Sequence, residues 1–340
     1  MVSIDNPTNL TAAFDWLEFT VQSLTLNRLI EGVLRLNNDE FKPLKCGKFG
    51  YNTQLKWADG NLFILFNADQ KETPQPIKDD PMGIHVIITG TGCRTYEKSQ
   101  GLQELILCVI GGVPSHKFTR IDLAIDDRCE KLLRFERIHR AAIAGHFTSR
   151  WNKWEEINSR KCADGQYIGR TMYFGSQKSD LFIRIYDKKL ERLANNPNET
   201  DPNAANWTRL EVVYKKDRAQ MLAEYLVDHE DIGCLLRQTL NNYIRFIVQP
   251  SSTDTNKSRW PTANWWQALI GDVAKLSLTI QPLDRTIDQM QEWVNQQISP
   301  TIAAIMTAHD GEIDWLYDII ATGKTRLRAK HKDAISQFKN

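Results

Sequence analysis

Short segments in the first two thirds of the chain alternate apolar and polar residues, or form brief apolar runs, as β-strands do. These segments are residues 15–21, 83–90, 118–126, 171–174, 181–186 and 207–215, with a glycine-punctuated meander at 46–67. Apolar residues recur at helical spacing at 24–36, 102–110, 130–144 and, with a break near Gly233, at 218–248. The order predicts an α+β fold with a largely antiparallel sheet and flanking helices.

The chain changes character after residue 250. The segment PSSTDTNKSRWPT at 250–262 has turn-forming residues and almost no aliphatic side chains, which predicts a linker. Beyond it the spacing is helical throughout, with amphipathic helices at 278–308 and 313–320. We therefore expect a flexible N-terminus at 1–13, a catalytic domain at 14–249, the linker at 250–262, and a helical C-terminal domain with a basic tail at 263–340.

Composition excludes several classes of protein. The 340 residues contain no apolar run near the roughly 20 residues that span a bilayer, and the N-terminus lacks the pattern of a signal peptide, which predicts a cytoplasmic protein. Six scattered cysteines without a Cys-x-x-Cys pair indicate neither a zinc site nor a disulfide framework. Gly90-Thr91-Gly92 predicts a tight bend, and no Gly-Lys-Ser/Thr follows that would make a phosphate loop.

A predicted hairpin at 171–191 carries the strongest candidate for chemistry. Alternation along its second strand places Phe182, Arg184, Tyr186 and Lys188 on one face. A phenol is a weak nucleophile at neutral pH, but neighbouring positive charge favours the phenolate and can activate it. The alternative is a tyrosine and two cations on an ordinary solvated sheet face.

Two further strands carry acids that could bind a metal. In TRIDLAIDD (119–127), Asp122 and Asp126 share a face, and in WTRLEVVYK (207–215) Glu211 shares one with Arg209. If these strands lie near the tyrosine strand, their oxygens suit Mg²⁺ or Mn²⁺. The alternative is a structural ion network in which the acids pair with nearby arginines.

Four stretches, in order, resemble the Rep-trans family of rolling-circle replication initiators. They are GIHVIITGTGCRTYE at 83–97, TRIDLAIDD, GSQKSDLFIRIYDKKLE at 175–191 and WTRLEVVYK, with looser matches in DWLEFTV at 15–21 and EWVNQQISPTIAAI at 292–305. The resemblance implies that Tyr186, in Tyr186-Asp187-Lys188, is the catalytic tyrosine. It also implies acidic ligands for Mg²⁺ or Mn²⁺, matched most plainly by Asp122 and Glu211 and less so by Asp126 and Asp127. The seven histidines form no His-hydrophobic-His motif of the kind used by other nickases.

The mechanism implied by this resemblance is a transesterification at a replication origin. Tyr186 would form a 5′-phosphotyrosyl intermediate and a free 3′-OH, and the strand would later be rejoined. Arg184 and Lys188 would stabilise the developing charge, and the metal would orient the phosphate. Two alternatives remain open, namely a non-catalytic origin or operator DNA-binding protein and a metal-dependent nuclease that acts through water.

Candidate DNA contacts come from basic segments on a chain whose net charge is only +1. Trp151 and Trp154 lie among cations, a mixture that suits single strands, although tryptophans are also typical core residues. The full set of predicted DNA-binding residues is Arg150, Trp151, Lys153, Trp154, Lys178, Lys189, Arg326 and Arg328. Beyond duplex and single-stranded origin DNA, the family resemblance implies a homodimer and a host helicase and polymerase as partners.

Overall fold

The computed structural model describes residues 2–3, 10–58, 60–69, 74–195, 206–250, 254–271, 287, 290–291, 294–325, 327 and 329–339. Contacts divide the chain into two units, Met1–Leu278 and Thr279–Asn340, which are treated separately below. None of the six cysteines, all of which lie among the described residues, forms a disulfide. No helix in the described ranges is long and apolar enough to cross a membrane.

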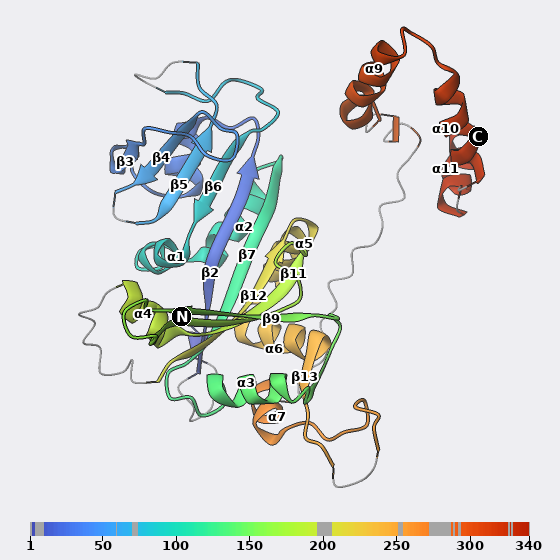
Figure 1. Cartoon of the computed structure of the whole chain (residues 1–340). Helices are drawn as coiled ribbons and strands as arrows, with labels where there is room; N and C mark the ends of the chain where they lie inside the picture. The colour runs from blue at the N-terminus through green and yellow to red at the C-terminus, as the bar shows by residue number, and fades with distance from the viewer. Residues whose placement is uncertain are drawn as a thin grey trace. The chain divides into compact units, whose positions relative to one another are not determined.

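The first unit is built on one antiparallel sheet (Figure 1). Its described strands follow the order β3-β4-β5-β6-β2-β7-β12-β11-β10-β9, and β1 pairs with β2. Their bounds are Val2–Ser3 (β1), Leu10–Val21 (β2), Phe41–Pro43 (β3), Thr53–Trp57 (β4), Leu62–Phe66 (β5), Ile84–Ile88 (β6), His116–Asp127 (β7), Trp154–Arg160 (β9), Tyr167–Phe174 (β10), Leu181–Asp187 (β11) and Thr208–Lys215 (β12). The short strands β8 (Phe147–Ser149) and β13 (Ile244–Phe246) form a second, two-stranded sheet.

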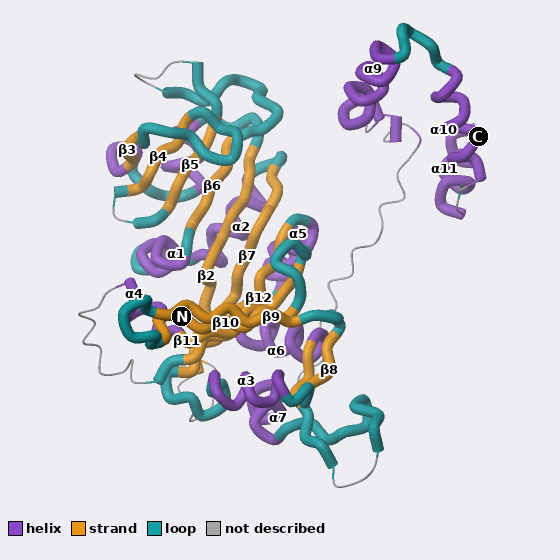
Figure 2. Tube along the Cα trace, viewed as in Figure 1, coloured by secondary structure: helices purple, strands orange, loops and turns teal. Residues whose placement is uncertain are grey.

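Helices pack against the sheet (Figure 2). Their bounds are Arg28–Val33 (η1, π-helical), Asn38–Glu40 (η2), Gly90–Tyr96 (α1), Leu102–Gly112 (α2), Phe135–Ile143 (α3), Lys188–Asn195 (α4), Asp217–Asp228 (α5), Ile232–Tyr243 (α6) and Asn264–Ile270 (α7). Helix α5 packs on β7 and β12, and α6 on β2 and β7. The described part of the second unit is helical, with η4 (Val294–Ile298), α9 (Ser299–Ala308), α10 (Asp314–Thr325) and α11 (Ala329–Lys339).

Strand alternation separates a core face from a polar face. On β11, the side chains of Leu181, Ile183 and Ile185 are buried in the main hydrophobic cluster, as the period of two requires. On β12, Tyr214 lies on this core side, where its hydroxyl hydrogen-bonds to Thr239 of α6 at 2.8 Å. The other face of these strands carries the charged side chains. The predicted α+β fold, with an antiparallel sheet and a helical C-terminal region, is confirmed.

Two local predictions differ from the structure. Residues 10–13 fall in the range expected to be flexible, yet they belong to β2, where Leu10, Ala12 and Ala13 are buried. Gly90-Thr91-Gly92 starts helix α1 and does not make a bend between strands.

The boundary between the two units also lies later than predicted. Helix α7, expected in the C-terminal domain, packs in the first unit, because Trp266 and Leu269 are each 2 % exposed and Trp266 contacts the ring of Phe246. Part of the expected linker pairs with the same region through the bridge between Ile247 and Thr262. Turn-forming composition therefore did not make 254–262 a free linker.

Candidate active site

Tyr186 lies near the end of β11 on the polar face of the sheet. The antiparallel register places Tyr186 opposite Arg209 and Arg184 opposite Glu211 of β12. On the far side of β12, Arg209 is opposite Asp126 of β7. Residues far apart in sequence therefore meet on one surface, as the alternation predicted, while their catalytic roles remain predictions.

The hydroxyl of Tyr186 is held by a carboxylate and approached by an ammonium group. Its Oη donates a hydrogen bond to Glu211 Oε1 at 2.5 Å. Lys188 Nζ lies 3.4 Å from Tyr186 Oη and also forms an ion pair with Glu191. Lys188 is the first residue of α4, so the end of β11 brings the ammonium group back over the phenol ring.

Burial governs the protonation of this pair. Burial and the negative charge of Glu211 raise the pKa of Tyr186 well above its usual value, and Arg209 only partly offsets them. A neighbouring cation thus favours the phenolate as expected, but burial and the charge of Glu211 outweigh it in this arrangement. Burial and the nearby Asp15 carboxylate raise the pKa of Glu211 to about 8, against the opposing effect of Arg184 and Arg209. Deprotonation of the phenol consequently needs an acceptor, and Glu211 is already in hydrogen-bond contact with it.

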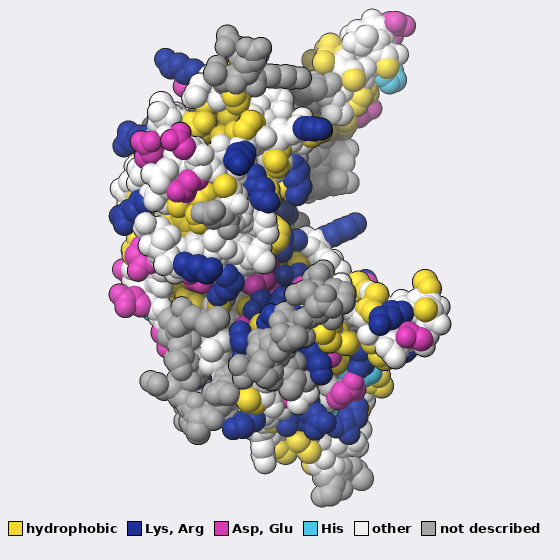
Figure 3. Space-filling model, turned by 90° about the vertical axis from the view of Figure 1, so that its left-hand side faces the viewer, with side chains coloured by type: hydrophobic (Ala, Val, Ile, Leu, Met, Phe, Trp, Pro, Cys, Tyr) yellow, Lys and Arg dark blue, Asp and Glu magenta, His cyan; other side chains and the backbone are white. Residues whose placement is uncertain are grey.

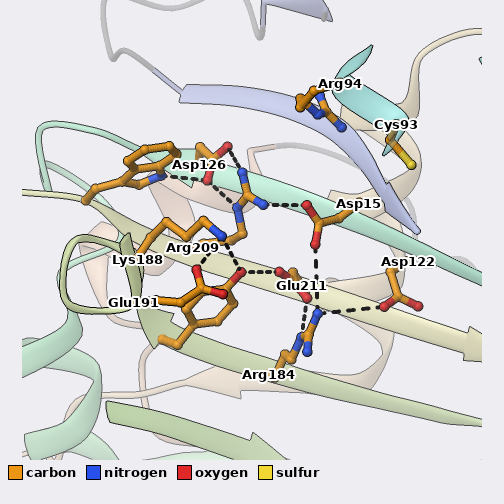
Figure 4. Close-up of polar contacts among 12 residues, drawn as sticks. Asp15, Cys93, Arg94, Asp122, Asp126, Arg184, Lys188, Glu191, Arg209 and Glu211 are labelled. Atoms are coloured by element: carbon orange, nitrogen blue, oxygen red, sulfur yellow. Dashed lines mark hydrogen bonds and ion pairs between the residues drawn. The ribbon is translucent and has the colours of Figure 1, made fainter. Parts of the chain in front are cut away.

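Arg184 lies among three carboxylates from three strands (Figure 4). Its Nε pairs with Glu211 Oε2, and its Nη2 lies 3.8 Å from both Asp15 Oδ2 and Asp122 Oδ2. Glu211 and Asp122 are fully buried, so the guanidinium offsets charge that water cannot solvate. The guanidinium of Arg184 thus occupies the centre of this acidic cluster.

Arg209 forms a second buried junction beside the first. Its guanidinium donates to both oxygens of Asp126, at 2.6 and 2.7 Å, and to Asp15 at 2.5 Å. Trp207 Nε1 donates to Asp126 at 2.7 Å. Asp126 is therefore fully engaged by protein donors.

Asp15 is a site residue that the strand pattern did not single out. A register shift between Phe14 and Trp16 interrupts the pairing of β2 with β7, and a bulge of this kind re-aims the side chain at the irregular position. Gly90 lets α1 approach it closely, since a Cβ there would lie 3.1 Å from Asp15 Oδ1. The signal available in the sequence was the DWLEFTV segment, which begins with this aspartate.

The acidic residues do not fit a divalent ion in this arrangement, although their oxygens are of the type that Mg²⁺ or Mn²⁺ prefers. Asp122 accepts a two-point interaction from Arg120 at 2.9 and 2.6 Å, and both oxygens of Glu211 are taken by Tyr186 and Arg184. No group of three or more acids, histidines or cysteines among the described residues is spaced to hold a metal. The contacts are those of the alternative weighed from sequence, a structural ion network.

A cavity of about 710 Å³ opens beside Tyr186. Its walls come from β2, α1, β11, α4 and β12, with Trp16 and Trp207 among the lining side chains. Its charged lining residues are Arg94, Arg128, Arg184, Lys188, Arg192, Arg209, Asp15 and Glu191. Figure 3 shows the molecule from the side that holds α1 and α4, and Lys and Arg side chains gather near the middle of that face. Cations outnumber acids in the lining, so the cavity suits an anionic ligand.

The predicted DNA-binding tryptophans make intramolecular contacts. The ring of Trp151 stacks on Tyr243 with centroids 5.0 Å apart, and Trp154 stacks on Phe174 at 6.1 Å. Both side chains pack against the main hydrophobic cluster. These contacts are those of core residues, the alternative noted from sequence, and a role in base stacking remains a prediction.

The predicted DNA-binding cations are dispersed. Arg150 and Lys178 are exposed, and Lys153 pairs with Glu155 at 2.7 Å. Lys189 is half-buried in α4, one residue beyond Lys188. Arg326 and Arg328 lie outside the described residues. None of the four described cations, Arg150, Lys153, Lys178 and Lys189, lines the cavity beside Tyr186, and contact of the whole predicted set with DNA remains a prediction.

The comparison with known sequences decides the family. Residues 116–320 match the Rep-trans family, described as "Replication initiation factor". The chain belongs to this family. Residues 11–105 match the "Rolling Circle replication initiation protein N-terminal domain". The Rep-trans match covers β7 through β12, and therefore every candidate site residue on the sheet except those of β2.

Two relatives extend the Rep-trans likeness to most of the chain. A protein of Bacillus subtilis (strain 168) named "Putative DNA relaxase NicK" is 28 % identical over 344 residues, across 99 % of this chain and 91 % of its own length. A solved structure of a rolling circle replication initiator protein from Geobacillus stearothermophilus superposes with a TM-score of 0.65 at 30 % identity. It covers 79 % of this chain and 98 % of its own.

Proposed function

We propose that this Rep-trans protein initiates rolling-circle DNA replication by nicking one strand at an origin, with Tyr186 as the nucleophile. The names of its relatives, a rolling circle replication initiator and a DNA relaxase, support the nicking activity. The observation that carries the choice of residue is the contact of Tyr186 Oη with Glu211 at 2.5 Å, on the wall of a cavity whose charged lining residues are mostly cations.

In the proposed reaction, Tyr186 Oη attacks the scissile phosphorus and the bond from phosphorus to the 3′ oxygen breaks. Glu211 in its ionised form takes the phenol proton, and the departing oxygen takes a proton from water to become a free 3′-OH. The product is a 5′-phosphotyrosyl link, and attack by a 3′-OH on that link reverses the chemistry and rejoins the strand. The number of phosphoester bonds is conserved, so no nucleotide hydrolysis is needed.

The proposal gives Lys188 and Arg184 different roles toward the negative charge that develops on the phosphate. Lys188 Nζ is 3.4 Å from the attacking oxygen, and Arg184 holds the base, Glu211, from the other side. We assign Lys188 to the phosphate and to the phenolate. Arg184 acts on Glu211 in this arrangement, and it reaches the phosphate after release from its carboxylates.

Mg²⁺ or Mn²⁺ at Asp122, Glu211 and Asp126 remains a prediction from the family resemblance. A divalent ion would have to displace the guanidinium of Arg184 from the centre of the cluster, and Asp126 would have to leave Arg209 and Trp207. No step of the proposed mechanism is therefore assigned to a metal. Homodimer formation, the host helicase and polymerase, and a cytoplasmic location also remain predictions.

The test is a nicking assay on a supercoiled plasmid that carries the origin of the element encoding this chain. The wild-type protein should relax it and leave a protease-resistant adduct, which mass spectrometry places on the peptide that contains Tyr186. The Tyr186→Phe variant should bind the same DNA and form no adduct. A DNA-binding protein without activity would leave the plasmid supercoiled, and a nuclease acting through water would still cut after Tyr186→Phe; either result rejects the proposal.

A further inference from the structure

Arg94 of α1 lines the same cavity as Tyr186 but has no part in the ion network on the sheet. It lies one helical turn after Gly90, the residue that brings α1 against Asp15, so its side chain lies near the acidic cluster without joining it (Figure 4). Of the cavity arginines on the sheet, Arg184 and Arg209 are bound to buried carboxylates. Arg94 differs from both in its hydrogen bonding.

The guanidinium of Arg94 is shielded from solvent and lacks hydrogen bonds. Its Nε, Nη1 and Nη2 are each buried and find no hydrogen-bond partner in the structure. Its ionic partner among the described residues is Glu97, one helical turn on, with 3.1 Å between Nη1 and Oε2. A guanidinium has five N–H donors, and leaving buried donors unpaired costs free energy. A phosphate in the cavity would satisfy them once the side chain, which is 30 % exposed, turns these nitrogens toward it.

We propose that Arg94 binds a phosphate of the DNA strand next to the phosphate attacked by Tyr186. The planar guanidinium matches two oxygens of a phosphate through paired hydrogen bonds, which an ammonium group cannot reproduce. The cavity volume of about 710 Å³ is within the range that takes a nucleotide-sized ligand, and its lining is rich in cations. The inference rests on the proposed nicking function, since it makes the occupant of the cavity a single DNA strand.

A variant of Glu97 distinguishes phosphate binding by Arg94 from a purely structural role of Arg94. Burial raises the pKa of Glu97, and Arg94 only partly offsets that effect. If Arg94 served only to pair with Glu97, then Glu97→Gln would reproduce the effect of Arg94→Gln. If Arg94 binds phosphate, Glu97→Gln frees the guanidinium and DNA binding is kept.

The experiment measures binding of a fluorescent oligo(dT) of about 20 nucleotides, a length that spans common single-strand sites, by the full chain carrying Tyr186→Phe. Arg94→Gln in this background should bind about tenfold more weakly. The negative slope of log affinity against log salt should become shallower by about 0.7, the value for one contact to a single strand. Arg94→Lys should keep the slope and lose part of the affinity. Lys98→Gln, an exposed cation four residues on that does not line the cavity, is the matched control and should bind normally.

Unchanged affinity and salt slope in Arg94→Gln would overturn the inference, and so would an equal loss in Glu97→Gln. Thermal unfolding of each variant separates these results from a failure to fold. Adduct formation by the wild-type chain is scored separately. Absence of the adduct rejects the nicking proposal, whereas the oligo(dT) measurement still decides whether Arg94 contacts the strand.

Discussion

The phenol of Tyr186 donates a 2.5 Å hydrogen bond to Glu211 of the neighbouring strand, and both side chains are buried. The pair sits beside Arg184, which also holds Asp15 and Asp122. The carboxyl group of Glu211 and the phenol of Tyr186 therefore share a buried hydrogen bond, and burial opposes the ionisation of both groups. Burial of these ionisable groups lowers the stability of the fold. Unfolding measurements on variants of the same residues can determine by how much.

The stability of the protein should fall between about pH 5 and pH 8, and Glu211 should cause part of the fall. Its pKa is raised from 4.5 to about 8 in the folded protein, so the native state keeps a proton that the unfolded chain has already lost. The unfolded state then binds fewer protons, and the free energy of unfolding decreases as pH rises through this window. Urea unfolding of Glu211→Gln should show a shallower decrease than the wild type.

The control for this prediction is Glu155→Gln, which changes a half-exposed glutamate on β9. Its pH profile of unfolding should follow that of the wild type. If Glu211→Gln and Glu155→Gln gave the same profile, Glu211 would not be the buried acid that titrates in this range.

Removing Arg209 should strongly destabilise the first unit. Arg209→Met leaves Asp15 and Asp126 without their shared cation, and breaking a buried ion pair in this way costs about 3–5 kcal/mol. Urea unfolding measures the loss, and adding Asp126→Asn should recover part of it. Lys117→Met breaks an exposed pair with Asp217 at 2.8 Å and should cost at most about 1 kcal/mol. Equal losses in the two single variants would contradict the buried junction.

The position of Arg184 predicts how the protein responds to metal. Because the guanidinium occupies the centre of three carboxylates, Arg184→Met should lower the melting temperature, and Mn²⁺ should then restore part of it by binding the freed acids. Mn²⁺ should raise the melting temperature of the wild type by less. The double variant Arg184→Met, Glu211→Gln removes one acid and should lose most of the response. An equal Mn²⁺ effect in all three proteins would show that the ion binds elsewhere.

The side chains on β11, β7 and β12 could be placed from sequence because each follows a regular strand period. Tyr186, Arg184 and Glu211 meet where alternation puts them. Asp15 could not be placed in this way, since the irregular pairing between Phe14 and Trp16 breaks the period at that position. Arg94 was missed because glycines at 90 and 92 were interpreted as a bend, whereas they start a helix.

The charges were harder to predict than the positions. Sequence gives the cations around Tyr186 but not their partners, and Arg184 and Arg209 turn out to neutralise acids. Burial then raises the pKa of the phenol where isolated cations would lower it. Such effects depend on which groups exclude water, and that is a property of the packed fold.

The end of the folded first unit gives a last prediction, on truncated proteins. Helix α7 buries Trp266, Leu269 and Ile270, and Trp265 and Trp266 both contact the ring of Phe246. A chain of residues 1–278 keeps these contacts and should unfold cooperatively, with a midpoint in urea close to that of the first transition of the full protein. A chain of residues 1–249 loses all of them.

Loss of a buried tryptophan alone costs about 3–5 kcal/mol, and a domain is stable by only about 5–15 kcal/mol, so the 1–249 chain should be unfolded or aggregated at 25 °C. Far-ultraviolet circular dichroism with urea titration distinguishes the two chains. The linker predicted at 250–262 would make them equally stable, because nothing beyond it would contribute to the first unit. Equal urea midpoints for 1–249 and 1–278 would therefore show that the first unit ends before residues 250–262, as the sequence predicts. A large difference would show that α7 unfolds together with the sheet.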